Sequence, residues 1–208
     1  MEWPEGPYTR YPRATMWLVR PGEYTPLGSD EVEDVDAFYV SKAPVTNAQY
    51  EVFAPGHRGS HGAAGDDEPV VNVSWEDANK YCDWYAEWTG KPFRLLTAVE
   101  WEYAARGEDE PGCWLAADPR AGEKCVWHQG NSGGVLHPIE QALANSMGLY
   151  DILGGVWEWT SSGTDEASYV QRGGSFRMAL EELGCGVHRS REMSWRGDDT
   201  GFRIARSL

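Results

Sequence analysis

The alternation of apolar and polar positions predicts short strands towards both ends of the chain. Residues 17–28 alternate apolar residues with turn formers, and residues 37–40 (AFYV) form a second short apolar run, so we expect an edge hairpin there. Further short runs, separated by glycine and polar turns, predict strands at 156–159, 168–173, 186–189 and 201–205.

Helical signals lie between these two groups of strands. In three places a Ser or Thr stands three positions before an acidic or amide side chain, which predicts capping boxes: Thr46 with Gln49, Ser74 with Asp77, and Thr97 with Glu100. After the second box, apolar residues recur at helical spacing and predict one buried stripe: Ala78, Tyr81, Cys82 and Tyr85. Gly107 stands where the third helix needs a left-handed residue to end. Early helices and late antiparallel strands are typical of an α+β domain.

The middle of the chain predicts an irregular segment. Residues 108–147 are rich in Gly, Asp, Pro and Asn and are longer than most connections in compact domains. With 208 residues the chain can bury one substantial core. We therefore expect an N-terminal extension over residues 1–16 and a single domain over residues 17–208.

Charge narrows the classes of partner. The formal net charge of −15 would repel a phosphate backbone or an anionic membrane surface, so we expect no nucleic acid partner and no membrane insertion. The first six residues (MEWPEG) lack the basic and apolar regions of a signal peptide, and no run approaches the roughly 18 apolar residues of a membrane span. These features predict a soluble chain in the cytoplasm or in a phage or viral particle.

The cysteines do not predict a disulfide scaffold or a metal site. They are few, widely separated and without tight metal-ligand spacing: Cys82, Cys113, Cys125 and Cys185. A bridge between Cys113 and Cys125 across the irregular segment is one possibility. The favoured alternative is that these cysteines are buried or free thiols.

Five segments, taken in order, resemble the formylglycine-generating-enzyme (sulfatase-modifying-factor) family. They are residues 42–53 (KAPVTNAQYEVF), 70–107 (beginning VVNVSWEDANKYCDWY), 148–160 (GLYDILGGVWEWT), 172–176 (RGGSF) and 201–206 (GFRIAR). The resemblance covers nearly the whole chain from about residue 17. It implies a C-type lectin-like fold with few short helices, short antiparallel strands and long irregular loops. It also implies a ligand-binding segment at about 172–208.

A structural calcium site is the one cofactor that this resemblance implies here. Asp151 and Glu158 flank a glycine-rich turn, and hard oxygen ligands of this kind suit Ca²⁺. The resemblance implies that both carboxylates bind the ion together with the carbonyls of Gly154 and Val156. The alternative is that the carboxylates cap turns or pair with Arg172. A second family site would begin near Asn131, but the acidic residue expected after it is missing.

The tryptophans inside the family segments are expected to be core residues, because large buried aromatic side chains dominate core energetics. They are Trp75, Trp101, Trp157 and Trp159.

The thiols required for catalysis are missing. Active family members oxidise a substrate cysteine with oxygen and copper, using two thiols just after the GGS segment, and Cu(I) prefers such soft ligands. Here Met178 stands at or near the first thiol position, and Leu183 or Gly184 near the second, so no copper is expected. Cys185 matches another family cysteine. Its expected partner position holds Ala104 or Ala105, which predicts a packed thiol.

A non-catalytic branch of the family remains. The chain resembles the variable proteins of diversity-generating retroelements in its RGGSF segment, its missing copper thiols and its end two residues after GFRIAR. This implies a diversified C-terminal surface that binds protein ligands. The residues expected to face the ligand are Phe176, Arg177, Met178, Gly184, Gly186, His188, Ser190, Glu192, Ser194 and Trp195. The alternatives are a thiol oxidase with an atypical metal site, and a structural module of a larger surface or phage particle.

Overall fold

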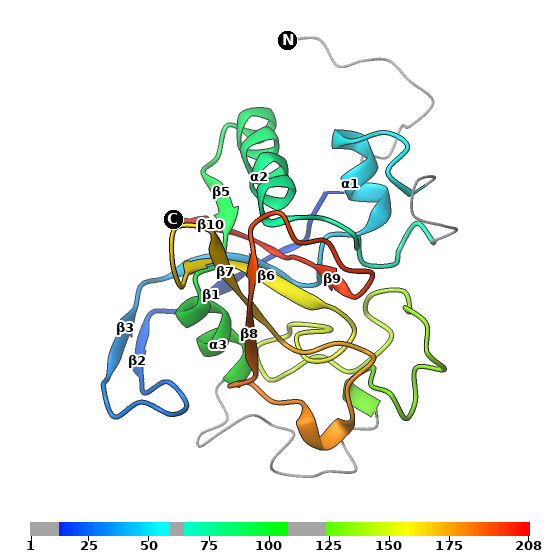
Figure 1. Cartoon of the computed structure of the whole chain (residues 1–208). Coiled ribbons are helices and arrows are strands. Elements are labelled where there is room, and N and C mark those ends of the chain that lie inside the picture. The colour runs from blue at the N-terminus through cyan, green and yellow to red at the C-terminus, as the bar shows by residue number, and fades with distance from the viewer. Residues whose placement is uncertain (1–12, 59–64, 108–123) are drawn as a thin grey trace.

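The computed structural model describes residues 13–58, 65–107 and 124–208, which form an α+β arrangement (Figure 1). The helices are α1 (Asn47–Phe53), α2 (Trp75–Thr89) and α3 (Ala98–Arg106). Each begins at a predicted capping box, in which the hydroxyl and the third-position side chain exchange hydrogen bonds with backbone amides. Gly107 ends α3 with a φ of 73°, so all three predicted helix starts and this helix end are confirmed.

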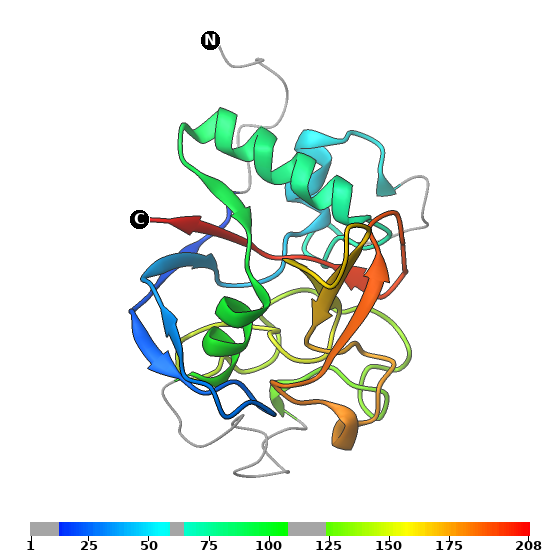
Figure 2. The ribbon, with the colours of Figure 1, turned by 60° about the vertical axis from the view of Figure 1, so that its left-hand side comes forward.

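The first sheet joins the two ends of the described chain. Its strand order is β1 (Met16–Val19), β4 (Phe38–Ser41), β10 (Ile204–Ser207) and β5 (Phe93–Leu95), with every neighbouring pair antiparallel. The predicted N-terminal hairpin is more complex than expected. β1 pairs with β4, and between them in the sequence β2 (Gly22–Tyr24) pairs with β3 (Glu33–Val35) in a hairpin that packs beside α3 (Figures 1 and 2).

Two hydrophobic clusters cover the two faces of this sheet. α2 lies over one face, where its predicted apolar stripe packs with Phe93, Leu95 and Ile204. α3 lies over the other face, where Trp101 packs in a cluster with Ala205. Neighbouring strand residues point to opposite faces, so Ile204 and Ala205 contribute to different clusters. Figure 2 shows the two helices on either side of the sheet.

The second sheet carries the C-terminal segment. Its order is β8 (His188–Glu192), β7 (Ser168–Arg172), β6 (Trp157–Gly163) and β9 (Thr200–Gly201), with β8 at one edge. A 3₁₀ turn, η3 (Leu180–Glu182), precedes β8. The last predicted strand is divided, because the chain leaves the second sheet after β9 and enters the first as β10. Gly201 is needed at this crossing, because a Cβ there would lie 2.4 Å from the Val70 carbonyl oxygen.

The stretch 124–156 is irregular, as predicted, and carries an isolated bridge between Trp127 and Gly154. Residues 108–123 of the predicted irregular segment lie outside the described residues. Within the described ranges, no helix combines the length and the apolar character that crossing a bilayer requires.

Most of the predicted core tryptophans are buried. Trp101, Trp157 and Trp159 are no more than 5% exposed. Trp75 is only half-buried, because its ring packs at the start of α2 against Tyr169 of β7, with 3.6 Å between the ring centroids.

The cysteines confirm one expectation, since the favoured free and buried thiols are found at Cys82 and Cys125, and correct another. Cys82 and Cys125 are free, buried thiols, so Cys125 forms no bridge with Cys113. Cys185 is disulfide-bonded and is not the packed thiol that was predicted. That prediction considered only a bridge to α3, where Ala104 and Ala105 offer no sulfur. Cys113 lies outside the described residues.

Candidate ligand-binding surface

A buried ion pair lies where the chain passes between the two sheets. Arg203 and Glu158 are both fully buried, and Arg203 Nε and Nη2 each lie 2.7 Å from a carboxylate oxygen of Glu158. Trp101 Nε1 donates to the same carboxylate at 2.7 Å. The guanidinium also donates to four backbone carbonyls, those of Ser41, Lys42, Tyr150 and Asp151. Arg203 therefore supplies the positive charge at this junction.

This pairing bears directly on the calcium ligands implied by the resemblance. Glu158 directs both carboxylate oxygens at Arg203 and not at an open cage. Arg172, the alternative partner, pairs with Glu102 of α3 at 3.0 Å. Neither Asp151 nor Glu158 therefore pairs with Arg172. Arg203 is close to both residues, because it pairs with the Glu158 carboxylate and donates to the Asp151 carbonyl.

Asp151 alone offers a free oxygen. Its Oδ2 accepts from the Glu140 amide at 2.7 Å, and its Oδ1 has no hydrogen-bond partner among the described residues. Burial raises the pKa of Asp151 to about 6. Calcium needs about six to eight oxygen ligands. No group of three or more His, Cys, Asp or Glu side chains in the described ranges could hold a metal ion. Of the two carboxylates in the implied ligand set, only that of Asp151 keeps an oxygen open to an ion, and the calcium site with Gly154, Val156 and Glu158 stays a prediction.

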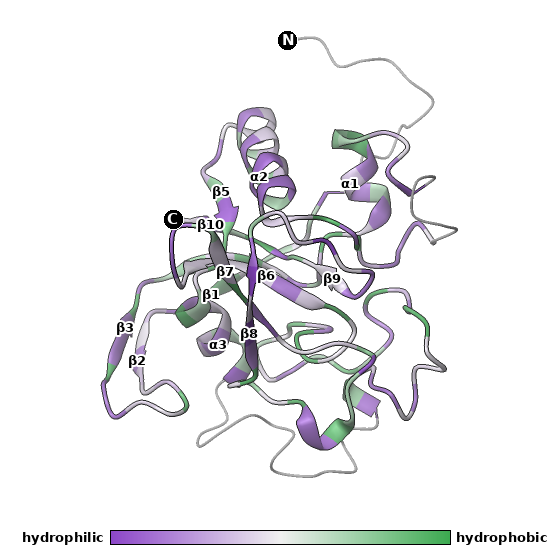
Figure 3. Ribbon diagram, in the orientation of Figure 1, coloured by the Kyte–Doolittle hydropathy of each residue, from purple (hydrophilic) through white to green (hydrophobic). Residues whose placement is uncertain are grey.

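The strand β8 presents two different faces. Its sequence HRSRE alternates, so that His188, Ser190 and Glu192 are exposed on one side and the two arginines, Arg189 and Arg191, lie on the other. β8 is a hydrophilic strand throughout, as Figure 3 shows in purple. Because β8 is an edge strand, both faces lie at the rim of the second sheet.

The loop formed by residues 193–199 is held through its backbone. The amide of Trp75, at the start of α2, donates to the Met193 carbonyl at 3.0 Å, and the amide of Asn72 donates to the Gly197 carbonyl at 2.9 Å. The amide of Trp157 in β6 donates to the Asp199 carbonyl at 2.8 Å. These bonds do not involve the side chains of Ser194 and Trp195. The loop conformation is therefore set by framework atoms and leaves these side chains available.

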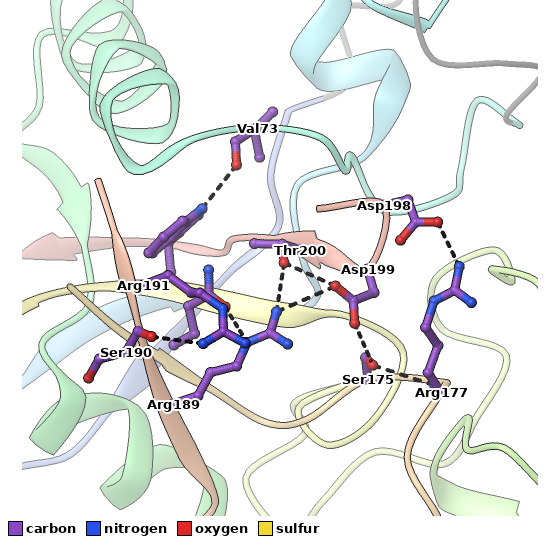
Figure 4. A network of polar contacts seen from close by, with 11 residues as sticks. Val73, Ser175, Arg177, Arg189, Ser190, Arg191, Asp198, Asp199 and Thr200 are labelled. Carbon is purple, nitrogen blue, oxygen red and sulfur yellow. Dashed lines mark hydrogen bonds and ion pairs between the residues drawn. The ribbon is translucent and has the colours of Figure 1, made fainter. Parts of the chain in front are cut away.

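Asp199 connects the start of the C-terminal segment with its end. Its carboxylate accepts from the hydroxyl of Ser175 at 2.9 Å, while Arg189 lies 3.4 Å away and also donates to the Thr200 hydroxyl at 3.0 Å. Figure 4 shows Asp199 between Ser175 on one side and Arg189 with Thr200 on the other. Arg177 and Asp198 form a second, more exposed link at 2.6 Å.

Of the residues expected to face a ligand, six are exposed: Arg177, His188, Ser190, Glu192, Ser194 and Trp195. They do not form one continuous face. His188 and Ser190 lie on the side of β8 opposite Arg189, whereas Trp195 lies on the arginine side, with its ring centroid 5.3 Å from the Arg191 guanidinium. The two glycines are half-buried, and a Cβ at Gly186 would meet Leu27 at 3.0 Å.

Phe176 corrects the expectation of an exposed aromatic side chain. It is 3% exposed, and the Arg177 guanidinium lies 4.7 Å from its ring centroid. Met178 is half-buried and packs against the same core cluster as Leu183. The positions that the resemblance assigns to copper thiols are thus filled by apolar side chains in contact with the core.

Sequence reasoning missed two residues of this surface, Arg189 and Arg191. The signal was present, because the alternation in HRSRE places both arginines on one face once β8 is known to run from 188 to 192. The predicted strand ended at 189, and this hid the pattern. The carboxylates of Asp198 and Asp199 bind the side chains of Arg177 and Ser175, respectively.

A family model for the sulfatase-modifying factor enzyme 1-like domain matches residues 6–208. The chain belongs to this family. The bovine protein named inactive C-alpha-formylglycine-generating enzyme 2 is 34% identical over 161 residues, which cover 66% of this chain and 50% of the bovine one. The formylglycine-generating enzyme of Mycobacterium tuberculosis is 39% identical over 105 residues, 45% of this chain and 33% of its own. The matches thus span half or less of the length of these family members.

Solved structures confirm the predicted fold. Treponema denticola variable protein 1 superposes with a TM-score of 0.85 at 20% identity, covering 94% of this chain and 95% of that one. PvdO from Pseudomonas aeruginosa superposes with a TM-score of 0.74 at 22% identity, covering 93% and 94%. The U1 variant of Major Tropism Determinant reaches 0.51 at 10% identity, covering 82% and 50%. The family member described here has the C-type lectin-like fold of the formylglycine-generating-enzyme type.

Proposed function

We propose that this chain is a non-catalytic binding protein that recognises protein ligands with residues 176–200, in the manner of the variable protein of a diversity-generating retroelement. The observation that carries the proposal is the backbone anchoring of the 193–199 loop. Hydrogen bonds from Asn72, Trp75 and Trp157 hold carbonyls of this loop, so the conformation does not depend on the side chains at 194 and 195. A surface of this kind tolerates replacement of its side chains.

The composition of the exposed side chains also supports recognition of proteins. Trp and Arg are enriched at the energetic centres of protein interfaces, and Trp195 is 43% exposed beside Arg191. The fold is shared with Treponema denticola variable protein 1 and with Major Tropism Determinant, which agrees with a display function for this segment.

The absence of catalysis is supported by the apolar packing of Met178 and Leu183. A bovine relative carries the word inactive in its name, while others in the family are named as enzymes. The purified chain should bind no stoichiometric copper and consume no oxygen with a cysteine peptide. Either activity would support the thiol oxidase and contradict this proposal.

The flanking nucleotide sequence tests the origin of the surface. We expect a near-copy of the coding segment for residues 176–200 beside a reverse transcriptase gene, with differences concentrated in the codons of exposed positions. Absence of both would overturn the retroelement version. A matched protein experiment replaces Ser190, Glu192 and Ser194 together with alanine and compares unfolding curves, which should coincide with those of the original chain.

A further inference from the structure

One arginine of the proposed binding surface differs from the others. Three of the four arginines between residues 176 and 200 form ion pairs: Arg177 with Asp198, Arg189 with Asp199, and Arg196 with Asp77. Arg191 has no carboxylate within ion-pair distance among the described residues. Its Nη1 donates to the Ser190 carbonyl at 3.1 Å, and its buried Nε has no hydrogen-bond partner in the part of the chain that the structure describes.

The surroundings of Arg191 present donors rather than acceptors. On the same face of the sheet, Gln171 is fully buried. Its Oε1 accepts from Arg189 Nε at 2.7 Å, and its Nε2 has no hydrogen-bond partner within the described ranges. Arg189 adds a second guanidinium, whose ring contact is Trp157 at 4.3 Å. The Asp199 carboxylate already has partners of its own: it accepts from the hydroxyls of Ser175 and Thr200, and the Arg189 guanidinium lies 3.4 Å away.

One aromatic ring lies beside this guanidinium. The ring centroid of Trp195 lies 5.3 Å from it, and Tyr169, the residue opposite Arg191 in β7, stacks on Trp75 at 3.6 Å. The guanidinium fork matches the two oxygens of a carboxylate, and such bonds are about twice as strong as neutral ones. An arginine that lies beside an aromatic ring and pairs with no acidic residue in the described ranges is therefore suited to accept one from outside.

The absence of a carboxylate partner for Arg191 among the described residues is unusual in a chain this acidic. The chain has 33 acidic residues against 18 lysines and arginines, so carboxylates are abundant, yet none of the described ones pairs with Arg191. We propose that Arg191 and Trp195 together form the anchor for an aspartate or glutamate side chain of a protein ligand. This rests on the proposed function and specifies the chemistry of its partner.

A selection experiment tests the proposal with a defined probe. A library of random peptides displayed on phage is selected on the full chain, and peptides that still bind the Trp195→Ala chain are removed. The retained peptides should share an acidic residue. Its replacement by the matching amide, or Arg191→Gln in the chain, should each weaken binding about tenfold, and the two changes together should cost little more than one.

Arg206→Gln is the matched control. Its guanidinium also lies over an aromatic ring, 4.1 Å from the centroid of Tyr39, but on β10 of the first sheet. It should leave peptide affinity unchanged. Arg191→Lys keeps the charge without the fork and should restore only part of the affinity. The free energies of unfolding of all variants should stay within about 1 kcal/mol of that of the original chain, which separates lost binding from lost folding.

The possible results separate the two proposals. Retained peptides without a shared acidic residue, with affinities insensitive to Arg191→Gln, would overturn the acidic anchor and leave the proposed function standing. If no selected peptide loses binding to the Trp195→Ala chain, both proposals are contradicted: the binding function of this surface and the acidic anchor that rests on it.

Discussion

Two arginines in the last twenty residues illustrate opposite uses of the same side chain. Arg203 is fully buried, and its donors reach both oxygens of Glu158 and four backbone carbonyls. Arg191 lies at the sheet edge beside Trp195, and none of the described carboxylates pairs with it. A fully satisfied buried network makes the core rigid and specific. A guanidinium at a sheet edge that pairs with no carboxylate of the described residues remains available to an acidic group of a ligand.

The same contrast separates the framework from the binding surface. Framework segments meet through buried side chains, such as Trp101 and Glu158. The 193–199 loop meets the framework mainly through backbone atoms, with a side-chain bond between Arg196 and Asp77 in addition. Substitutions in the framework should therefore change stability, whereas substitutions in the loop should change binding.

The largest expected effect is on the buried pair. Glu158→Gln keeps the shape of the side chain but leaves Arg203 buried without a counter-charge, which should reduce the free energy of unfolding by about 3–5 kcal/mol. Denaturant unfolding measures this. Asp198→Asn breaks the exposed pair with Arg177 and is the control, with an expected loss of about 0–1 kcal/mol. Equal losses in the two variants would remove the distinction between framework and surface.

Trp195→Ala should have the next largest effect, and on binding alone. Its ring is 43% exposed and touches the Arg191 guanidinium. Removing an exposed aromatic anchor should weaken binding of a selected peptide by about 2 kcal/mol or more, while the free energy of unfolding changes by about 0.5–1 kcal/mol. Calorimetric titration and denaturant unfolding give the two numbers. A loss of stability as large as the loss of binding would place Trp195 in the framework.

A smaller effect on stability is expected from breaking the hydrogen bond between Ser175 and Asp199, which joins the start of the C-terminal segment to its end. Ser175→Ala removes the hydrogen bond to Asp199 and should cost about 1 kcal/mol of stability. Asp199 fixes one end of the 193–199 loop. The substitution should therefore also speed up hydrogen exchange at the backbone amides of Asn72 and Trp75, which donate to carbonyls of this loop. Unchanged exchange at Asn72 and Trp75 would show that the backbone bonds alone hold the loop.

The framework was largely predictable from the sequence, because its signals are local. Thr46, Ser74 and Thr97 mark their helices through capping boxes that involve only four residues each. In the second sheet, β6 and β7 overlap strands predicted from short runs bounded by glycine and polar turns, whereas β8 is hydrophilic throughout. The partners of the buried charges were not predictable in this way, since Arg203 and Glu158 are far apart in the chain and no short pattern encodes their contact.

The surface was predicted only in part, and for a physical reason. An alternating strand reveals which residues share a face only if both its ends are known. Ending β8 at residue 189 concealed Arg191, and treating Phe176 as an ordinary member of the variable segment overlooked its burial. The disulfide at Cys185 was missed because a partner was sought only on α3.

Calcium should have the smallest effect. A ligand that binds only the folded state stabilises it increasingly as its concentration rises above the Kd, by about 2.7 kcal/mol at a hundredfold excess. Because Arg203 already neutralises Glu158, and Asp151 keeps one free carboxylate oxygen, millimolar calcium or a chelator should leave the melting temperature unchanged. Glu158→Gln should respond equally little. A reversible rise in the melting temperature with calcium, lost in Asp151→Asn, would show instead that the guanidinium and a metal ion can occupy this junction together.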